Sequence, residues 1–512
     1  MFKSSSIRNG DATTTDFPYA NQREMGLGRA VVRHRRLLSI AVACVVLLMT
    51  VEGRCSTQTW SPGGAGGGNG AWNTSTANWN GNKKWSDGND AVFSGTGGTV
   101  TVASVTANSL TFNGTGPYQL TGGTLWLNND AVTVNSAATI GSAISVFANL
   151  SLSGDGTLTL TGNSSQAYQG IFDFFSDLTL LNINGGGNVT DANASIGETS
   201  GSNATVAVSG IGSTWTTTDT LDVGTFATGA LQISNGGTVS SEGSVMGYLN
   251  NVSGSVTVSG SGSQWATTDL TIGDMGTGTL QITNGGTVSV SGPVILGAMA
   301  GSSGTLKVSG SGSKLTQTGN LFLTVGGDSL SDSGVGLLSI SNGGTVTSSE
   351  MMVGGTGTLA FGKNATVNNS IFVYGGLLEG SGSGSSLAVN SDVTLYAGST
   401  LMLDIDAASN LADELEISNG DFVLSGDDTL TIALLNGSQL TLPSYVLATF
   451  PTGGISGQFS TTNLPNGYEL DYGTGVPGEL RMVAAVPEPG ACALLMVAAA
   501  ALGMLRRHRS RA

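Results

Sequence analysis

Histidine is almost absent from this 512-residue chain, and the two that exist, His34 and His508, lie near its ends. The long region between them has no histidine for a Ser-His-Asp triad, a Cys-His pair or a histidine-ligated zinc ion. We therefore expect a protein that is not an enzyme and that has no cofactor and no metal site.

Cysteine is scarce as well. Cys44 and Cys492 lie in apolar runs near the two ends, and Cys55 is the only other cysteine. No intrachain disulfide is expected in the central region. Its stability must come from backbone hydrogen bonds and buried aliphatic side chains.

Basic residues are rare between Ser56 and Gly490, where six Lys and Arg face 30 Asp and Glu, a net charge of −24. Nucleic acid is excluded as an expected partner because phosphate binding needs clustered Lys and Arg. A strongly anionic polysaccharide is also disfavoured as a direct ligand unless cations bridge the two. Spread negative charge keeps an exported protein soluble.

Glycine is abundant, at 80 residues, whereas proline contributes only 10. The glycines follow no Gly-X-Y period, which excludes a collagen-like triple helix. Dense β-branched residues between Gly-rich turns predict an all-β fold with many short strands.

Two short phrases alternate along the chain. Ser-Asn-Gly-Gly-Thr-Val begins at Ser234 and Ser341, with a near copy at Thr283, and Ser-Gly-x-Gly-Ser begins at Ser209, Ser259 and Ser309. Aligning them gives one apolar residue per unit, in steps of 25, 25, 25, 24, 26, 32 and 21 residues. This first column contains Ile183, Val208, Ile233, Val258, Ile282, Val308, Ile340 and Phe361.

Two further apolar columns share this period. The second contains Val189, Trp215, Val239, Trp265, Val288, Leu315, Val346 and Val367. Members of the third precede a glycine: Ile196, Val223, Met246, Ile272, Leu296, Val325, Val353 and Tyr374. Three short strands in about 25 residues predict a parallel β-solenoid, because stacked rungs bury what one rung cannot. A two-sheet sandwich is the alternative, although it does not require a constant period.

The units at 183–375 resemble the PEP-CTERM and autotransporter-associated repeats of long bacterial surface β-helices. The predicted organisation is a Trp-rich cap with degenerate rungs at 54–180, regular rungs at 181–375 and a β-rich cap at 376–485. The cap is expected to close the exposed edge of the stack. The β-barrel translocator that ends an autotransporter is not recognised in the sequence.

The N-terminal residues have the order of a secretory signal. Basic residues, including Arg35 and Arg36, precede the apolar run Leu37–Met49, and cleavage is expected after Gly53. Residues 1–53 are therefore predicted to be a signal peptide, with Met25 as an alternative start. The Arg35-Arg36 pair leaves both the Sec and the twin-arginine route open.

The last 27 residues combine three parts: Val486-Pro487-Glu488-Pro489-Gly490, the apolar run Ala491–Leu505 and an Arg-rich end. The prolines keep the first part extended, the apolar run can enter a bilayer, and the arginines stay in the cytoplasm. A run of 15 residues spans roughly 22 Å of a hydrocarbon core of ~30 Å. A transient membrane segment fits better than the alternative, a permanent tail anchor.

This order resembles the PEP-CTERM sorting signal of bacterial surface proteins, which a membrane protease of the exosortase type cuts near the Pro-Glu-Pro. The resemblance implies that Val486, Pro487, Glu488 and Pro489 form a sorting motif within 486–512, with a short transmembrane helix at 491–505. It implies an exosortase-type partner and a location in the cell envelope, at the cell surface or in the extracellular matrix. We expect a structural or adhesive protein, with extracellular polysaccharide as a further partner. The alternative is a polysaccharide-binding module or a polysaccharide-active β-helix enzyme.

The charged residues do not show the pattern that such an enzyme needs. Lys307 and Lys314 share a rung without recurring carboxylates beside them, and Arg481 lies beyond the repeats. Polysaccharide lyases of this shape typically pair a basic residue with an acidic cluster, and hydrolases need two carboxylates in a cleft. The recurring Asp219, Asp222, Asp269 and Asp274 lie beside turns, where aspartate often caps its own backbone.

A denser acidic group and a group of tryptophans complete the candidates. The acidic group contains Asp404, Asp406, Asp413, Glu414, Glu416, Asp421, Asp427 and Asp428. We expect a solvated acidic face there, with calcium binding as the alternative, because EF-hand spacing is absent. Trp60, Trp72, Trp79 and Trp85 are expected to plug the open end of the solenoid, although they could instead stack on sugar rings.

Overall fold

A computed structural model describes residues 55–64, 66–146, 150–166, 173–326, 334–437, 439–451 and 453–485. The chain divides into two units, Met1–Cys55 and Ser56–Ala512. Of the first unit only Cys55 is described, and every described strand belongs to the second. The predicted signal peptide, sorting motif and transmembrane helix lie outside the described residues. Within those residues no helix has the length and apolar character to cross a bilayer.

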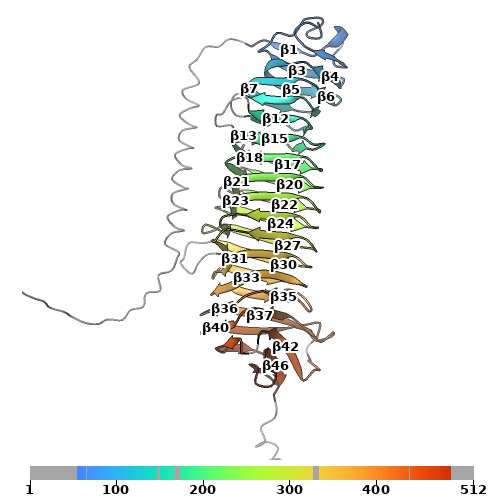
Figure 1. The fold of residues 1–512 in the computed structure, drawn as a ribbon. Coiled ribbons are helices and arrows are strands. Elements are labelled where there is room, and N and C mark those ends of the chain that lie inside the picture. The colour runs from blue at the N-terminus through green and yellow to red at the C-terminus, as the bar shows by residue number, and fades with distance from the viewer. Residues whose placement is uncertain are drawn as a thin grey trace, which may run out of the picture. The chain divides into compact units, whose positions relative to one another are not determined.

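Parallel strands stack into three faces, coil upon coil (Figure 1). Face 1 consists of β2 (Gly70–Trp72), β4 (Gly98–Val102), β6 (Tyr118–Thr121), β8 (Ala137–Ile140), β11 (Thr157–Leu160), β14 (Leu180–Ile183), β17 (Asn203–Ser209), β20 (Thr228–Ser234), β22 (Ser253–Ser259), β24 (Thr277–Thr283), β27 (Ser303–Ser309), β30 (Val335–Ser341), β32 (Gly357–Phe361), β34 (Leu377–Gly380), β37 (Thr400–Asp406), β41 (Thr429–Leu435) and β44 (Thr461–Asn463). The described pairings run in line from β2 to β44, so face 1 is an open ladder.

Faces 2 and 3 are built in the same way. Face 2 contains β9 (Ala143–Val146), β12 (Asn163–Gln166), β15 (Asn188–Asp191), β18 (Thr214–Thr217), β25 (Thr287–Val290), β28 (Lys314–Gln317), β35 (Ser386–Val389), β39 (Glu414–Ile417) and β42 (Ser444–Thr449). Face 3 contains β1 (Thr57–Thr59), β3 (Asp90–Gly95), β10 (Leu150–Ser153), β13 (Asp173–Ser176), β16 (Asn193–Ile196), β19 (Thr220–Val223), β26 (Val294–Leu296), β29 (Phe322–Val325), β36 (Val393–Tyr396), β40 (Phe422–Leu424) and β43 (Ile455–Ser456). Longer strands continue from face 2 into face 3: β5 (Val105–Gly114), β7 (Thr124–Val134), β21 (Thr238–Met246), β23 (Gln264–Ile272), β31 (Thr345–Val353) and β33 (Ala365–Tyr374).

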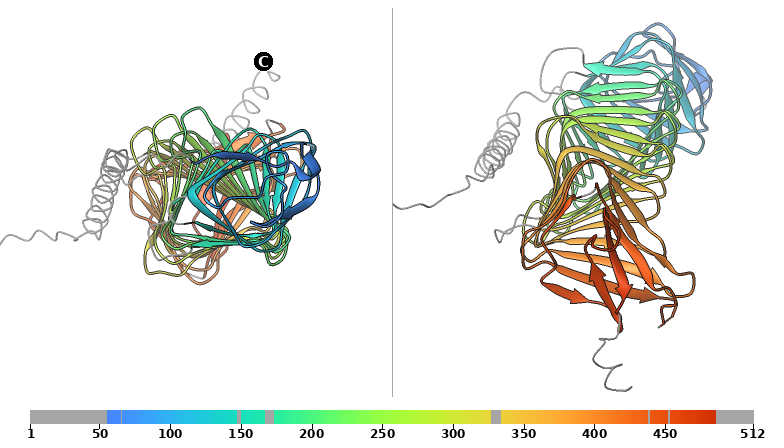
Figure 2. Two further views of the ribbon diagram at one scale, coloured as in Figure 1. Left: turned by 90° about the horizontal axis from the view of Figure 1, so that it is seen from above. Right: turned by 60° about the horizontal axis from the view of Figure 1, so that its bottom comes forward.

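The register of face 1 confirms the first predicted column. Ile183 pairs with Val208, and the same column continues rung by rung to Ile340 and Phe361. Every member is fully buried. The second column on face 2 is confirmed from Val189 to Val367. The all-β, β-helix-like prediction is therefore correct, and the coils superpose when viewed along the stack (Figure 2).

The third column is correct as far as Val353 and wrong at its last member. Val353 pairs with the buried Val373, not with Tyr374. Tyr374 points to the other side of the strand and pairs with Tyr396 on the next coil. Because side chains alternate between the two sides of a strand, an error of one residue exchanges inside for outside.

Glycine at the corner between face 3 and the next face 1 allows close approach of the backbone. Gly224 has φ of 74°, and a Cβ there would lie 2.4 Å from the carbonyl oxygen of Ser253 on the next coil. Residues other than glycine rarely adopt this conformation. The glycine after Val223 in the third column thus has a steric cause.

Tryptophans close the N-terminal end of the stack. Trp60, Trp72 and Trp79 are fully buried and Trp85 is 3% exposed. Edge-to-face contacts join Trp72 to Trp85 and Trp60 to Trp79, each with ring centroids 5.1 Å apart. The plug interpretation is confirmed, and stacking of these rings on a sugar is contradicted because their faces are inside the core. A short 3-10 turn, Pro62–Gly64, lies beside them.

The C-terminal end is closed by antiparallel strands. β42 pairs in parallel with β39 on one side and antiparallel with β46 (Glu479–Ala484) on the other. β46 also pairs with β45 (Tyr468–Asp471), and this end of the stack is red in Figure 2. The last strands of faces 1 and 3, β44 and β43, have only three and two residues. Short, interrupted edges of this kind hinder strand addition by another molecule.

Candidate binding surface

The two alternating phrases form the first corner, which we define as the turns between face 1 and face 2. Here Ser234 Oγ donates a hydrogen bond to Ser209 Oγ at 3.1 Å, and Asn235 Nδ2 donates to the same oxygen at 3.0 Å. Asn235 has φ of 52°, a conformation that asparagine tolerates better than most residues. One phrase therefore supplies donors to the hydroxyl of the other.

The same contacts recur along the first corner. Asn284 Nδ2 donates to Ser259 Oγ at 3.0 Å, and Asn342 Nδ2 donates to Ser309 Oγ at 3.1 Å. Ser341 Oγ also donates to Ser309 Oγ at 3.0 Å. The result is an outer row of hydroxyl and amide groups, spaced by the coil separation.

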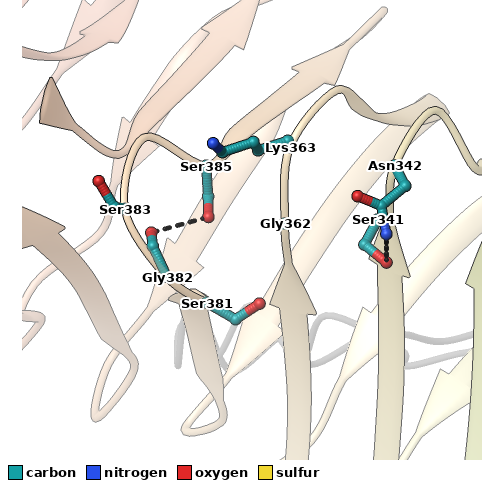
Figure 3. A pocket seen from close by; sticks show the side chains of 8 residues that line it. All are labelled: Ser341, Asn342, Gly362, Lys363, Ser381, Gly382, Ser383 and Ser385. Carbon is teal, nitrogen blue, oxygen red and sulfur yellow. Dashed lines mark hydrogen bonds between the residues drawn. The ribbon is translucent and has the colours of Figure 1, made fainter.

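The row is interrupted at Gly362. Ser341, Gly362 and Ser381 occupy equivalent positions at the ends of aligned strands of face 1, and only the middle one lacks a hydroxyl. A hollow of about 400 Å³ opens at this point, and the eight residues that line it are Ser341, Asn342, Gly362, Lys363, Ser381, Gly382, Ser383 and Ser385 (Figure 3). A Cβ on Gly362 would lie 2.8 Å from Ser341 Cβ. Gly362 therefore packs too closely against Ser341 to carry a side chain without a shift of the corner.

Sequence reasoning missed this hollow, although a signal was present. The corner from Phe361 to Val367 has the same length as the corner from Ile340 to Val346. Aligning them places Gly362 and Lys363 where the repeat has Ser341 and Asn342. Compared with the repeat, this corner has one hydroxyl group fewer and one ammonium group more, and this difference marks the site.

The acidic group only partly forms the expected solvated face. Asp413 and Asp428 are fully buried, and Asp404 and Asp406 are 9% and 7% exposed. Glu416, Asp421 and Asp427 are exposed, as expected. The expectation was wrong for these four aspartates. β38 (Leu411–Ala412) folds back against β37 beside Asp404, Asp406 and Asp413, whereas Asp428 lies in the turn before β41 and accepts a hydrogen bond from Gly426 N.

Two backbone donors hold the Asp413 carboxylate. Its Oδ1 accepts from Ser385 N at 2.7 Å and its Oδ2 from Asp404 N at 2.9 Å. Burial raises the pKa of Asp413 to about 6 despite these bonds. Burial and then the nearby Asp404 carboxyl raise the pKa of Glu379. No group of three or more His, Cys, Asp or Glu in the described part of the chain is arranged to hold a metal ion.

Asp406 lies beside the hollow and is held differently. Its Oδ2 accepts from Ser383 Oγ at 2.8 Å and from Asn436 Nδ2 at 3.2 Å, and its Oδ1 from Ala408 N at 2.9 Å. The Ser383 bond is the largest of the effects that hold the pKa of Asp406 well below its usual range. Its carboxylate is thus held by its own turn and by side chains of the two neighbouring coils.

The other sequence candidates do not converge. Asp219 lies in the turn between β18 and β19, Asp222 lies in β19, Asp269 lies in β23, and Asp274 follows β23. Lys307 lies on face 1 and Lys314 on face 2. The proposed lyase or hydrolase arrangement would require such groups in one cleft.

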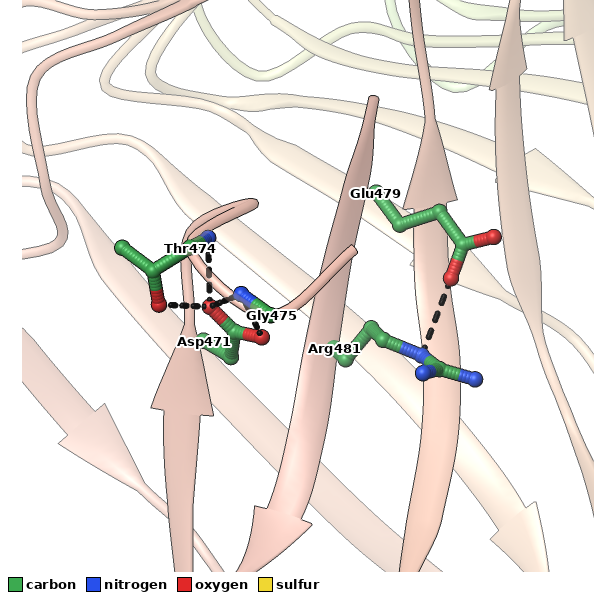
Figure 4. A network of polar contacts seen from close by, with 5 residues as sticks. All are labelled: Asp471, Thr474, Gly475, Glu479 and Arg481. Carbon is green, nitrogen blue, oxygen red and sulfur yellow. Dashed lines mark hydrogen bonds and ion pairs between the residues drawn. The ribbon is translucent and has the colours of Figure 1, made fainter. Parts of the chain in front are cut away.

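Arg481 belongs to the C-terminal cap. Its Nε lies 2.9 Å from Glu479 Oε2, on the same strand β46 (Figure 4). On the neighbouring strand Asp471 Oδ1 accepts from Thr474 N at 2.8 Å. Hydrogen bonds from Thr474 lower the pKa of Asp471, and Arg481 contributes further. These contacts fix the cap.

The sorting residues Val486, Pro487, Glu488 and Pro489 lie outside the described residues. The two described residues directly before them form backbone hydrogen bonds within the cap. Ala485 N donates to Gly467 O at 2.8 Å, and Ala484 N donates to Pro443 O at 2.8 Å.

No protein-family model matches the sequence. The chain is similar to the adhesin BmaC autotransporter of Brucella suis biovar 1 (strain 1330), with 34% identity over 141 residues. The match covers 24% of this chain and 4% of that protein. The two proteins therefore share a segment, and the chain spans only a small part of the relative's length.

Proposed function

We propose that this chain is an exported, non-enzymatic adhesive or structural protein of the bacterial surface or extracellular matrix. An exosortase-type protease sorts it at Val486–Pro489. The observation that carries the adhesive role is the segment shared with an autotransporter adhesin. The stacked coils support that role, because they present a long outer surface of short polar side chains.

The arrangement of the C-terminal cap supports sorting. Strand β46 ends at Ala484, and the amide of Ala485, the residue immediately before Val486, donates to Gly467 O. A protease that cuts near Pro487 would remove the apolar segment without breaking a backbone hydrogen bond of β46. The folded protein would therefore survive its own release.

The surroundings of the basic residues support a non-enzymatic role. Arg481 is paired with Glu479 in the cap, and Lys307 and Lys314 lie on different faces. A second candidate function, a polysaccharide-binding module, is favoured by the hollow at Gly362. It differs from general adhesion in requiring one defined site.

Intact mass of the native protein tests sorting. We expect a species that ends near Pro487–Gly490 in envelope and culture fractions. A matched variant, Pro487→Ala with Pro489→Ala, should keep its full C-terminus and stay with membranes. A wild-type chain that runs through Ala512 and is found only in membranes would contradict sorting.

Attachment of cells tests adhesion. A strain without the chain should attach less to its surface or matrix than the parent, and the complemented strain should recover. Equal attachment of all three strains, with the protein detected outside the parent cells, would contradict the adhesive role and leave the structural one.

A further inference from the structure

We propose that the hollow over Gly362 is a binding site for a carboxylated sugar unit of an extracellular glycan. The inference deepens the proposed adhesive function and rests on it. It concerns one site on the first corner, whereas adhesion in general could use the whole surface.

The shape of the site follows from the repeat. Gly362 lines the hollow between Ser341 and Ser381 of the adjacent coils and lacks the hydroxymethyl group that these two residues carry. The hollow of about 400 Å³ falls within the range of small-ligand sites, roughly 300–1,000 Å³. One or two sugar rings fit such a volume, whereas a protein partner would need a much larger surface.

The polar groups of the site are available to a ligand. Lys363, Asn342 and Ser381 are all exposed. In the part of the chain that the structure describes, no ion pair involves Lys363, and Ser381 Oγ and Asn342 Oδ1 have no hydrogen-bond partner. The site therefore offers an ammonium group, a hydroxyl and an amide oxygen, which suit a carboxylate and the hydroxyls of a sugar.

The charges around the hollow select for a carboxylate at one end. Lys363 carries one of only six basic groups between Ser56 and Gly490, and its side chain extends across the top of the hollow in Figure 3. An ammonium–carboxylate hydrogen bond is stronger than a neutral one. Asp406, on the far side of Ser383, would repel a second negative charge. A single carboxylate per bound unit therefore fits better than a densely charged chain.

Calorimetry on the purified full chain tests this site with three probes. These are a tetrasaccharide with one glucuronate unit, its carboxyl-reduced form, and acetate. Wild-type protein should bind the acidic tetrasaccharide about tenfold more tightly than the reduced one, since one charge-assisted bond is worth at least about 1.4 kcal/mol. Acetate should not compete at equal concentration.

Four variants locate the binding. Lys363→Gln should remove the preference for the acidic probe, and Gly362→Ser should abolish binding of both tetrasaccharides because its Cβ would press on Ser341 and displace the lining of the hollow. Ser381→Ala, an exposed change that leaves the backbone intact, should weaken both severalfold. Lys307→Gln, a lysine on the flat part of face 1, should bind like the wild type.

Three outcomes would overturn the site: equal weakening by Lys307→Gln and Lys363→Gln, unchanged binding by folded Gly362→Ser and Ser381→Ala, or full competition by acetate. Normal attachment of cells that carry Lys363→Gln, together with lost attachment of the deletion strain, would separate failure of this site from failure of adhesion.

Discussion

Tyr374 and Tyr396 lie on adjacent coils with their rings nearly parallel, 5° apart in plane and 4.3 Å between centroids. Tyr374 pairs in register with Tyr396, so the coil spacing itself brings the two rings together. Tyr374 occupies an outward position, although the sequence pattern assigned it to the core.

This pair should be energetically coupled. A double-mutant cycle with Tyr374→Ala and Tyr396→Ala is expected to give a coupling of about 0.5–1.5 kcal/mol in urea unfolding. Phe372 with Tyr396, whose centroids are 6.5 Å apart, is the matched comparison and should couple more weakly. Equal coupling of the two pairs would show that stacking is not the cause.

Gly224→Ala should destabilise the stack at the corner between face 3 and face 1. The positive φ costs about 1–2 kcal/mol for any other residue, and the new methyl group would press on the Ser253 carbonyl. Gly201→Ala is the control, because Gly201 has φ of 89° but no atom within 4 Å of its added Cβ. Urea midpoints should fall further for Gly224→Ala, and equal losses would contradict the close approach.

Trp79→Ala should open the N-terminal plug. Truncation of a buried tryptophan costs about 3–5 kcal/mol, and the first coils should lose protection in amide hydrogen exchange before the rest. Phe226→Ala is a control because Phe226 is 38% exposed, and a surface change of this kind costs within about 0.5 kcal/mol. Unchanged exchange of the first coils in Trp79→Ala would argue against a plug.

Stability should increase on mild acidification. The folded pKa of Asp413 is about 6, above its unfolded value of about 3.9. The folded state therefore binds the proton more tightly, and the gain is complete below the unfolded pKa and lost as pH rises through 6. We expect about 1 kcal/mol more stability at pH 5 than at pH 7 from this group, since one pKa unit corresponds to about 1.4 kcal/mol.

Burial also raises the pKa values of Glu379, Asp404, Glu414 and Asp428, so their contributions have the same sign. The lowered pKa of Asp406 acts in the opposite direction, but only at lower pH. Asp413→Asn should reduce the difference between pH 5 and pH 7, and the exposed Asp421→Asn should retain it. Greater stability at pH 7 in the wild type would contradict the assignment.

The sequence period was enough to place most of the core. Ile233 and Val258 could be aligned because a parallel stack repeats one inward position per coil. The apolar character of the side chain identifies that position. Tyr374 was misplaced because a glycine followed it, as in the earlier coils, while the true inward residue was its neighbour Val373. Local patterns cannot choose between adjacent residues when both are large and apolar.

The acidic group shows a different limit. The sequence does not indicate that Leu411–Ala412 turns back and buries Asp413, because this contact does not follow the period of the repeat. The hollow at Gly362 was within reach of the sequence, since it is a visible exception to a repeat. Exceptions to a period are easier to recognise than new contacts outside it.

Each coil pairs only with its two neighbours, so the number of coils can change without altering the pairing of the others. Val208 and Val258 both pair with Ile233 between them, so loss of that one coil would bring two equivalent residues together. Duplication of a coil would insert an additional coil. The length of the stack can therefore change by whole coils during evolution, while the end plug, the terminal cap and the pairing rule for every remaining coil stay as they are.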